Sequence, residues 1–170
     1  MKTLLSLALA IALIGVAAAP VARAEEPKDK AELAKAVRDA KVSLQKGLGA
    51  SSKEGKPISA KYELHEGHLQ LSVYTAKGGK FSEVIVDHGT GKVAKAEPIT
   101  QGEDFTAAKE QSAAMGKASV SLQKAVGKAV YANKGYKAVS VYPSVKDGEP
   151  VAEVTLVKGD DWKTVTEKLK

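Results

Sequence analysis

The chain has 170 residues, and its 26 basic residues outnumber its 20 acidic residues, which gives a formal net charge of +6 at pH 7. It contains no cysteine, which excludes disulfides, thiol nucleophiles and a lipid anchor on cysteine. Lysines alternate with acidic residues and arginine occurs only at Arg23 and Arg38, so we expect no nucleic-acid partner, because such sites concentrate arginine on one face.

The first 24 residues have the pattern of a secretory signal peptide. Lys2 precedes an uncharged stretch rich in Leu, Ala and Ile over 4–16, and Ala22–Ala24 is a small-x-small cleavage site. The alternative is a membrane anchor, but the apolar stretch is shorter than the roughly 20 residues that a spanning helix needs. We therefore predict cleavage between Ala24 and Glu25, and a mature protein without a membrane anchor, either periplasmic or secreted.

The first predicted element of the mature protein is a helix over 29–46. Its apolar stripe has helical spacing and consists of Leu33, Val37, Ala40 and Leu44. Three antiparallel strands follow at 58–65, 69–73 and 81–86, because apolar and polar residues alternate there. Glycine-containing turns separate these strands, which indicates hairpins.

A second, longer helix is predicted over 103–132. Its stripe includes many Ala and Ser residues, which favours close packing on a sheet over the alternative of a coiled-coil seam. Strands follow at 138–142 and 151–157. The last segment, 162–169, fits a helix as well as a strand, and its match to residues 81–86 favours the strand.

An internal repeat relates the two halves of the chain. The sequence Val42-Ser43-Leu44-Gln45-Lys46 recurs 78 residues later, at 120–124, and turn glycines and apolar positions downstream correspond as well. We predict an α+β fold of two units, 25–98 and 99–170, each a helix packed on a small antiparallel sheet of about three strands. The units would form either two small lobes or one continuous sheet with the helices on one face.

The end of the first unit carries the most specific motif. The segment Val84-Ile85-Val86-Asp87-His88-Gly89-Thr90-Gly91-Lys92-Val93 follows a predicted hairpin and resembles the PepSY domain family. The second unit lacks the Asp-x-x-Thr-Gly part. The resemblance implies a tandem pair of PepSY domains in a small exported protein, no assigned catalytic residue, and a role in inhibiting or restraining peptidases.

The same motif has a purely structural interpretation. Asp87 would cap its own turn, Thr90 would hydrogen-bond the loop backbone, and Gly89 and Gly91 would permit positive φ angles. Asp87, Thr90 and Gly91 are therefore predicted to form a structural turn.

Residues for catalysis are not apparent in the sequence. There is no Gly-x-Ser-x-Gly, phosphate-binding loop or His-Glu-x-x-His, so we expect neither an enzyme nor a cofactor. The only imidazoles are His65, His68 and His88. The first two flank a predicted turn, and all three support an alternative function in binding a metal or small ligand. Exposed histidines in turns are the ordinary explanation, so we assign no metal site.

A partner surface is predicted on the sheet face turned away from the helices. Its residues are Tyr74, Tyr142, Val151 and Val157. Because β-rich surfaces favour Tyr and Val in any case, the pattern does not distinguish a partner patch from an ordinary strand face. Free sheet edges would also accept an extended peptide by strand addition. The leading prediction is a non-catalytic exported protein-binding module that modulates a peptidase or another envelope protein.

Overall fold

The computed structural model describes residues 27–170. The predicted signal peptide and the cleavage site between Ala24 and Glu25 lie outside the described residues. Among residues 27–170, no helix is long and apolar enough to cross a membrane.

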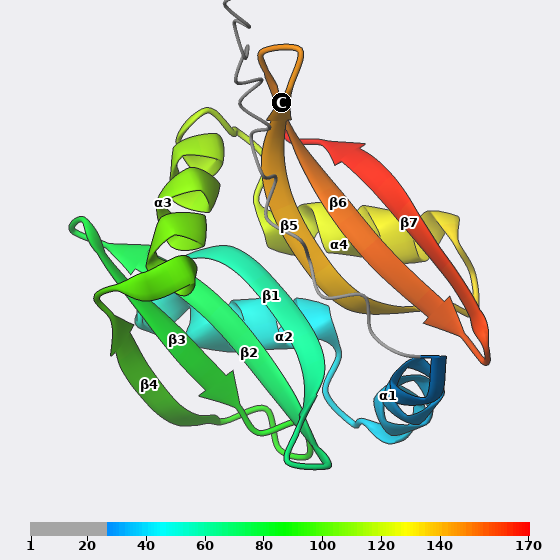
Figure 1. Cartoon of the computed structure of the whole chain (residues 1–170). Helices are drawn as coiled ribbons and strands as arrows, with labels where there is room; N and C mark the ends of the chain where they lie inside the picture. Colours follow the sequence, from blue (N-terminus) through cyan, green and yellow to red (C-terminus); the bar gives the residue numbers. More distant parts are fainter. Residues whose placement is uncertain (1–26) are drawn as a thin grey trace, which may run out of the picture.

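One antiparallel sheet of seven strands forms the centre of the fold (Figure 1). Its strand order is β4-β3-β2-β1-β5-β6-β7. The strands are β1 (Lys56–His65), β2 (His68–Lys77), β3 (Lys80–Val86), β4 (Val93–Ile99), β5 (Lys137–Lys146), β6 (Glu149–Lys158) and β7 (Asp161–Lys168). In the described part of the chain, strands account for 43% of the residues and helices for 34%.

The predicted fold of two units, each a helix on about three strands, is wrong. The seven strands form a single sheet with four helices, and β1 and β5 join its halves through the pairs Ala60–Val141 and Lys61–Ser140. A separate three-stranded sheet would leave the backbone N–H and C=O groups of β1 unpaired along one edge. Pairing of β1 with β5 satisfies part of that edge and makes one continuous core.

Four α-helices connect and cover the strands. They are α1 (Pro27–Asp39), α2 (Leu44–Ala50), α3 (Gly102–Gly116) and α4 (Leu122–Ala132), and a 3-10 turn, Ser51–Lys53, follows α2. Each long helix predicted from the sequence is therefore two helices. The breaks occur at Ser43 and Ser121, whose extended backbones begin α2 and α4 and whose hydroxyls accept hydrogen bonds from the backbone N–H groups of Lys46 and Lys124. Serine at an N-cap starts a new helix, and continuous apolar spacing concealed this signal.

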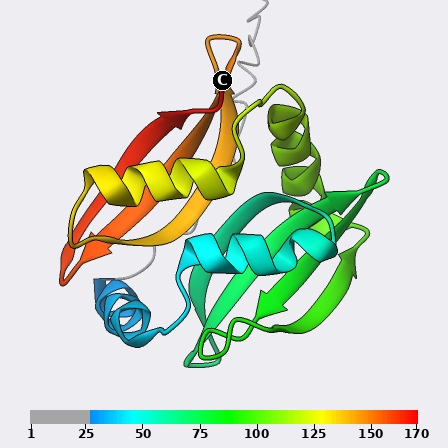
Figure 2. The ribbon, with the colours of Figure 1, turned by 180° about the vertical axis from the view of Figure 1, so that it is seen from behind.

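The helices lie on both faces of the sheet, not on one face. Helices α2 and α4 lie side by side over one face, and α3 lies on the opposite face (Figures 1 and 2). Helix α1 contacts β1, β2 and β5. Helix α2 approaches the sheet closely, because a Cβ at Gly47 would lie 2.6 Å from the buried Leu71 side chain.

The contact between α2 and α4 is reciprocal. The side-chain amide of Gln45 in α2 lies against Gly127 in α4, and the amide of Gln123 in α4 lies against Gly49 in α2. Gln123 lies 78 residues after Gln45, and Gly127 lies 78 residues after Gly49. The two contacts are therefore made by equivalent residues of the sequence repeat. Such an exchange of equivalent contacts is what a twofold interface produces, here within one chain.

Segment 162–169, for which the sequence left helix and strand open, is mainly strand. Residues Asp161–Lys168 form β7, which pairs with β6 along its whole length. Leu169 follows the strand and is fully buried, which explains why the segment also has helix-like apolar spacing.

Candidate functional site

Three of the four residues predicted as a partner surface are buried. Tyr74, Val151 and Val157 are only 9%, 7% and 4% exposed, whereas Tyr142 is 37% exposed. Helix α3 crosses the sheet face that was expected to be free, and its Phe105 packs edge-on against Phe81 with ring centroids 5.6 Å apart. The helix break before α4 was the missing signal, because only a separate α3 can reach this face.

A small hollow remains where α3 meets the sheet. It has a volume of about 110 Å³ and is lined by Lys61, Tyr74, Asp104, Ala107, Gln111 and Tyr142. The Lys61 amine pairs with the Glu63 carboxylate at 2.6 Å and lies 5.9 Å from the centre of the Tyr74 ring. Pockets that enclose small molecules usually have volumes of about 300–1,000 Å³, so the hollow is too small to bury one.

The charge states in this hollow do not suit general-base catalysis at neutral pH. Burial lowers the pKa of Lys61, but its hydrogen bond to Glu63 and the charges of neighbouring groups outweigh that effect and raise the pKa above its usual value. Burial raises the pKa of Tyr74 as well. Lys61 therefore stays charged and Tyr74 stays neutral, the states in which neither can accept a proton.

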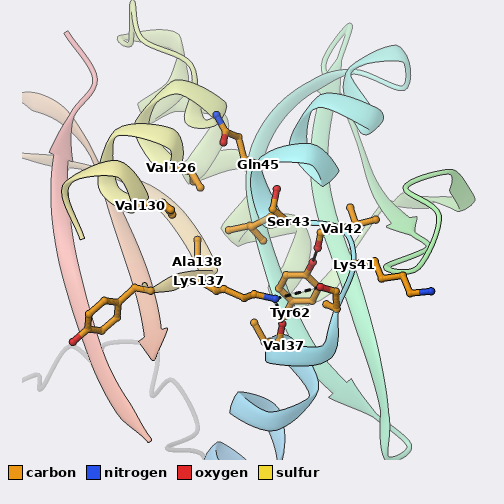
Figure 3. Close-up of a pocket in the computed structure, with 13 residues that line it drawn as sticks. Val37, Lys41, Val42, Ser43, Gln45, Tyr62, Val126, Val130, Lys137 and Ala138 are labelled. Carbon is orange, nitrogen blue, oxygen red and sulfur yellow. Dashed lines mark hydrogen bonds between the residues drawn. The ribbon is translucent and has the colours of Figure 1, made fainter. Parts of the chain in front are cut away.

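A larger cavity of about 230 Å³ lies between the α1–α2 connection, α4 and the start of β5 (Figure 3). Most of its lining is apolar. The Lys137 amine points at the C-terminal end of α1 and donates to the carbonyls of Val37, Arg38 and Ala40 at 3.1, 2.7 and 3.3 Å. An ammonium group has three donors, so Lys137 has none left for a ligand, and its charge stabilises the helix end.

The Tyr62 hydroxyl in the same cavity donates a hydrogen bond to the Val42 carbonyl, and burial raises the pKa of Tyr62 from 10.0 to about 12. A pKa that is higher in the folded state gives stability that is complete below pH 10 and is lost as the pH rises towards 12. We predict that Tyr62→Phe removes this pH dependence, on the order of 2 kcal/mol between pH 10 and 12. Urea unfolding of both proteins at these pH values measures it, and parallel losses in the two would contradict the assignment to Tyr62.

The histidines do not form a metal site with one another. His65 and His68 are paired across the end of the β1–β2 hairpin and both are exposed. His88 lies in the loop after β3, where its carbonyl accepts the backbone N–H groups of Lys41 and Val42. Within residues 27–170 there is no group of three or more His, Cys, Asp or Glu side chains placed to hold a metal ion. The structure therefore offers the metal-binding alternative only two facing imidazoles.

The Asp87 turn is held by its own side chains. The Asp87 carboxylate accepts hydrogen bonds from Gly89 N (3.0 Å), Thr90 N (2.6 Å) and Thr90 Oγ1 (2.9 Å). The side-chain and backbone hydrogen bonds from Thr90, followed by that from Gly89, hold the pKa of Asp87 below its usual value. Gly91 has a φ of 78° and donates its N–H to the Asp87 carbonyl, whereas Gly89 does not adopt a positive φ. These contacts shape the loop that receives the α1–α2 connection.

The two outer edges of the sheet differ. At one end β4 pairs with β3, and at the other end β7 is the last strand among the described residues (Figure 1). The β6–β7 loop has two residues, so Lys158 and Asp161 exchange both backbone hydrogen bonds and the pairs alternate from there. The backbone N–H and C=O groups of Trp162, Thr164 and Thr166 consequently point away from β6, towards the open edge.

The β4 edge carries a feature that prevents further pairing. Pro98 lies opposite Ser82, and the residues on either side of Pro98 form the pairs that exchange hydrogen bonds with β3. A backbone N–H at position 98 would therefore point outward, and proline has none. Proline is a common device against strand addition at a sheet edge. No proline occurs in β7, and the amine of its Lys163 is turned onto the Tyr136 ring, 4.1 Å from the centroid. The open edge of β7 is therefore the best candidate site.

No protein-family model, curated protein or solved structure matches the chain. The resemblance to the PepSY family, and the relation to peptidases that it implies, therefore stay predictions from residues 84–93.

Proposed function

We propose that this protein is a non-catalytic binding module that accepts an extended segment of a protein partner along the outer edge of β7. The observation that carries the proposal is an asymmetry within the sheet. Strand β3 has β4 on its outer edge, whereas β7, at the opposite end of the sheet, has no such strand among the described residues. Unpaired backbone groups on an edge strand are what strand addition uses.

Strand β4 shows what such an edge can hold. It runs antiparallel to β3, with Ile99 opposite Phe81 and Ala96 opposite Val84. In β3, Phe81 and Val84 lie opposite Ala76 and Val73 of β2. The corresponding positions of β7 are Trp162 and Val165, which lie opposite Val157 and Val154 of β6. A partner strand on β7 would thus place apolar side chains beside Trp162 and Val165. Backbone hydrogen bonds would supply affinity, and these two positions would supply selectivity.

The predicted exported location belongs to the same proposal. A sheet edge that binds extended chains suits a partner such as a peptidase or another envelope protein, which is the kind of partner that the PepSY resemblance implies. Catalytic residues are not needed for this activity. The buried Tyr74 and the ion-paired Lys61 support this non-catalytic assignment.

Peptide selection followed by an edge-blocking variant tests the proposal. Peptides selected from a random library on the purified protein should change the fluorescence of Trp162, the single tryptophan, which lies partly buried at the start of β7. Thr164→Pro removes an outward N–H and leaves the β6–β7 hydrogen bonds in place, so we predict that it weakens peptide binding about tenfold or more.

Thr164→Val is the matched control, because it keeps the backbone N–H and favours the strand. Its affinity for the peptides should stay within about threefold of the unaltered protein. Thermal unfolding checks that both variants fold. Equal peptide binding by the proline variant and the unaltered protein would rule out the β7 edge as the site.

A further inference from the structure

Strand β7 is complementary to itself when it is paired with a second copy in the antiparallel direction. With Val165 opposite Val165 of the other copy, Thr164 lies opposite Thr166, and Lys163 lies opposite Glu167. Trp162 then lies opposite Lys168. Oppositely charged pairs, Thr–Thr pairs and an aromatic residue beside a lysine all stabilise neighbouring strands.

The backbone of β7 fits this register. Residues 162, 164, 166 and 168 point their N–H and C=O groups outward, because they alternate with the residues that hydrogen-bond to β6. Pairing centred on Val165 sets outward residues opposite outward residues, so each such pair can exchange both hydrogen bonds. A register displaced by one residue would set outward groups opposite inward ones and form no ladder.

The charged pair would lie on the face of the sheet that α4 covers. Glu167 already pairs with Lys128 of α4 at 2.7 Å, and its side chain is only 12% exposed. Val165 lies opposite the buried Val154 on that same face. A second copy would bring its Lys163 to Glu167, so this mostly buried carboxylate would gain a second cation, and the two Val165 side chains would meet.

We propose that a second copy of this chain binds the outer edge of β7, by antiparallel β7–β7 pairing centred on Val165. This inference rests on the same open edge as the proposed function, and it commits that edge to a second copy of the chain. The two sheets would continue into one across a twofold axis, as an isologous interface requires. Pairing of β1 with β5, where Ala60 lies opposite Val141, shows that the same sheet already extends itself in this way inside the chain. One strand pair is a small interface, so we expect a dissociation constant on the order of 0.1 mM.

Charge reversal with rescue between two variants tests the register. In a dimer of Lys163→Glu, the carboxylate at 163 of each copy would lie opposite the Glu167 carboxylate of the other copy. In a dimer of Glu167→Lys, the amine at 167 of each copy would lie opposite the Lys163 amine of the other copy. Each variant alone should therefore dimerise at least tenfold more weakly. In an equimolar mixture of the two variants, the introduced carboxylate of one chain lies opposite the introduced amine of the other, and the retained Glu167 lies opposite the retained Lys163. We expect the mixture to form a heterodimer with an affinity within about threefold of the unaltered protein. Sedimentation equilibrium over a concentration series measures all four samples.

Thr164→Pro supplies an independent variant, because it blocks the edge without changing charge and should leave a monomer. A monomeric unaltered protein at about 1 mM, a dimer that persists in Thr164→Pro, or charge variants that show no rescue in the mixture would each overturn the proposal. The two proposals fail separately. If the protein is monomeric but Thr164→Pro still weakens peptide binding, the proposed function holds and self-pairing is ruled out. If the mixed variants form the heterodimer but the protein binds no peptide, self-pairing holds and the proposed function is ruled out.

Discussion

Deletion of Leu169 and Lys170 is expected to lower the free energy of unfolding by about 5 kcal/mol. Leu169 is fully buried, and loss of a buried leucine costs about 2–5 kcal/mol. Its carbonyl also accepts the backbone N–H groups of Ser119 (2.8 Å) and Val120 (2.9 Å), which precede α4. Ser119 is exposed and Val120 is partly buried, so the loss of each of these hydrogen bonds adds about 0.5–1.5 kcal/mol. Urea denaturation of the shortened and unshortened proteins measures the difference.

Deletion of Lys170 alone is the control for this truncation. Its amine pairs with Glu149 at 2.9 Å, but both side chains are more than half exposed, and such pairs contribute about 0–1 kcal/mol. The Leu169 carbonyl stays in place as part of the new terminal carboxylate. Equal losses for the two truncations would show that Leu169 does not anchor the end of β7 to the start of α4.

Leu44→Ala and Leu122→Ala are each expected to cost about 3–5 kcal/mol of the free energy of unfolding. The two leucines occupy equivalent places in the sequence repeat, each is the first residue of its helix, and each is 1% exposed. Truncation to alanine leaves a cavity that the packed helix and sheet cannot refill. Chemical denaturation with a two-state fit measures both losses.

The control for the leucines is Tyr131→Ala in α4, since Tyr131 is 81% exposed and its loss should change the free energy of unfolding by no more than about 0.5 kcal/mol. A loss under about 1 kcal/mol in either leucine variant would mean that the corresponding helix start does not pack into the core. If only one of the two variants lost free energy of unfolding, α2 and α4 would contribute unequally to stability despite their symmetric contacts.

The hairpins were predictable because their signals are local. Glu66 and Asp147 have φ angles of 50° and 51°, and each is followed by a glycine with positive φ, as two-residue primed turns require. Alternating apolar residues on either side then place the strands. The Asp87 turn is likewise built from residues within a few positions of one another, so its hydrogen bonds could be expected from the motif.

The candidate site was not predictable to the same extent. Residues 93–99 alternate only over 94–98, where the apolar members are two alanines and a proline, and all but Ile99 are exposed, so the segment alone does not mark itself as β4. Its pairing depends on the outward edge of β3, which forms only once the β2–β3 hairpin exists. The contrast between a covered β3 and an open β7 therefore could not be seen in the sequence.

The amino-acid sequence by itself determined the strands other than β4, the turns between them and the repeat of residues 42–46 at 120–124, because periodicity and glycine preferences act over a few residues. Only the tertiary structure decided that the halves share one sheet, that α3 covers Tyr74, and that no strand among residues 27–170 pairs with the outer edge of β7. These outcomes depend on which edges and faces meet between segments far apart in the chain. Backbone pairing along an edge is nearly independent of side-chain identity, so the sequence holds little information about it.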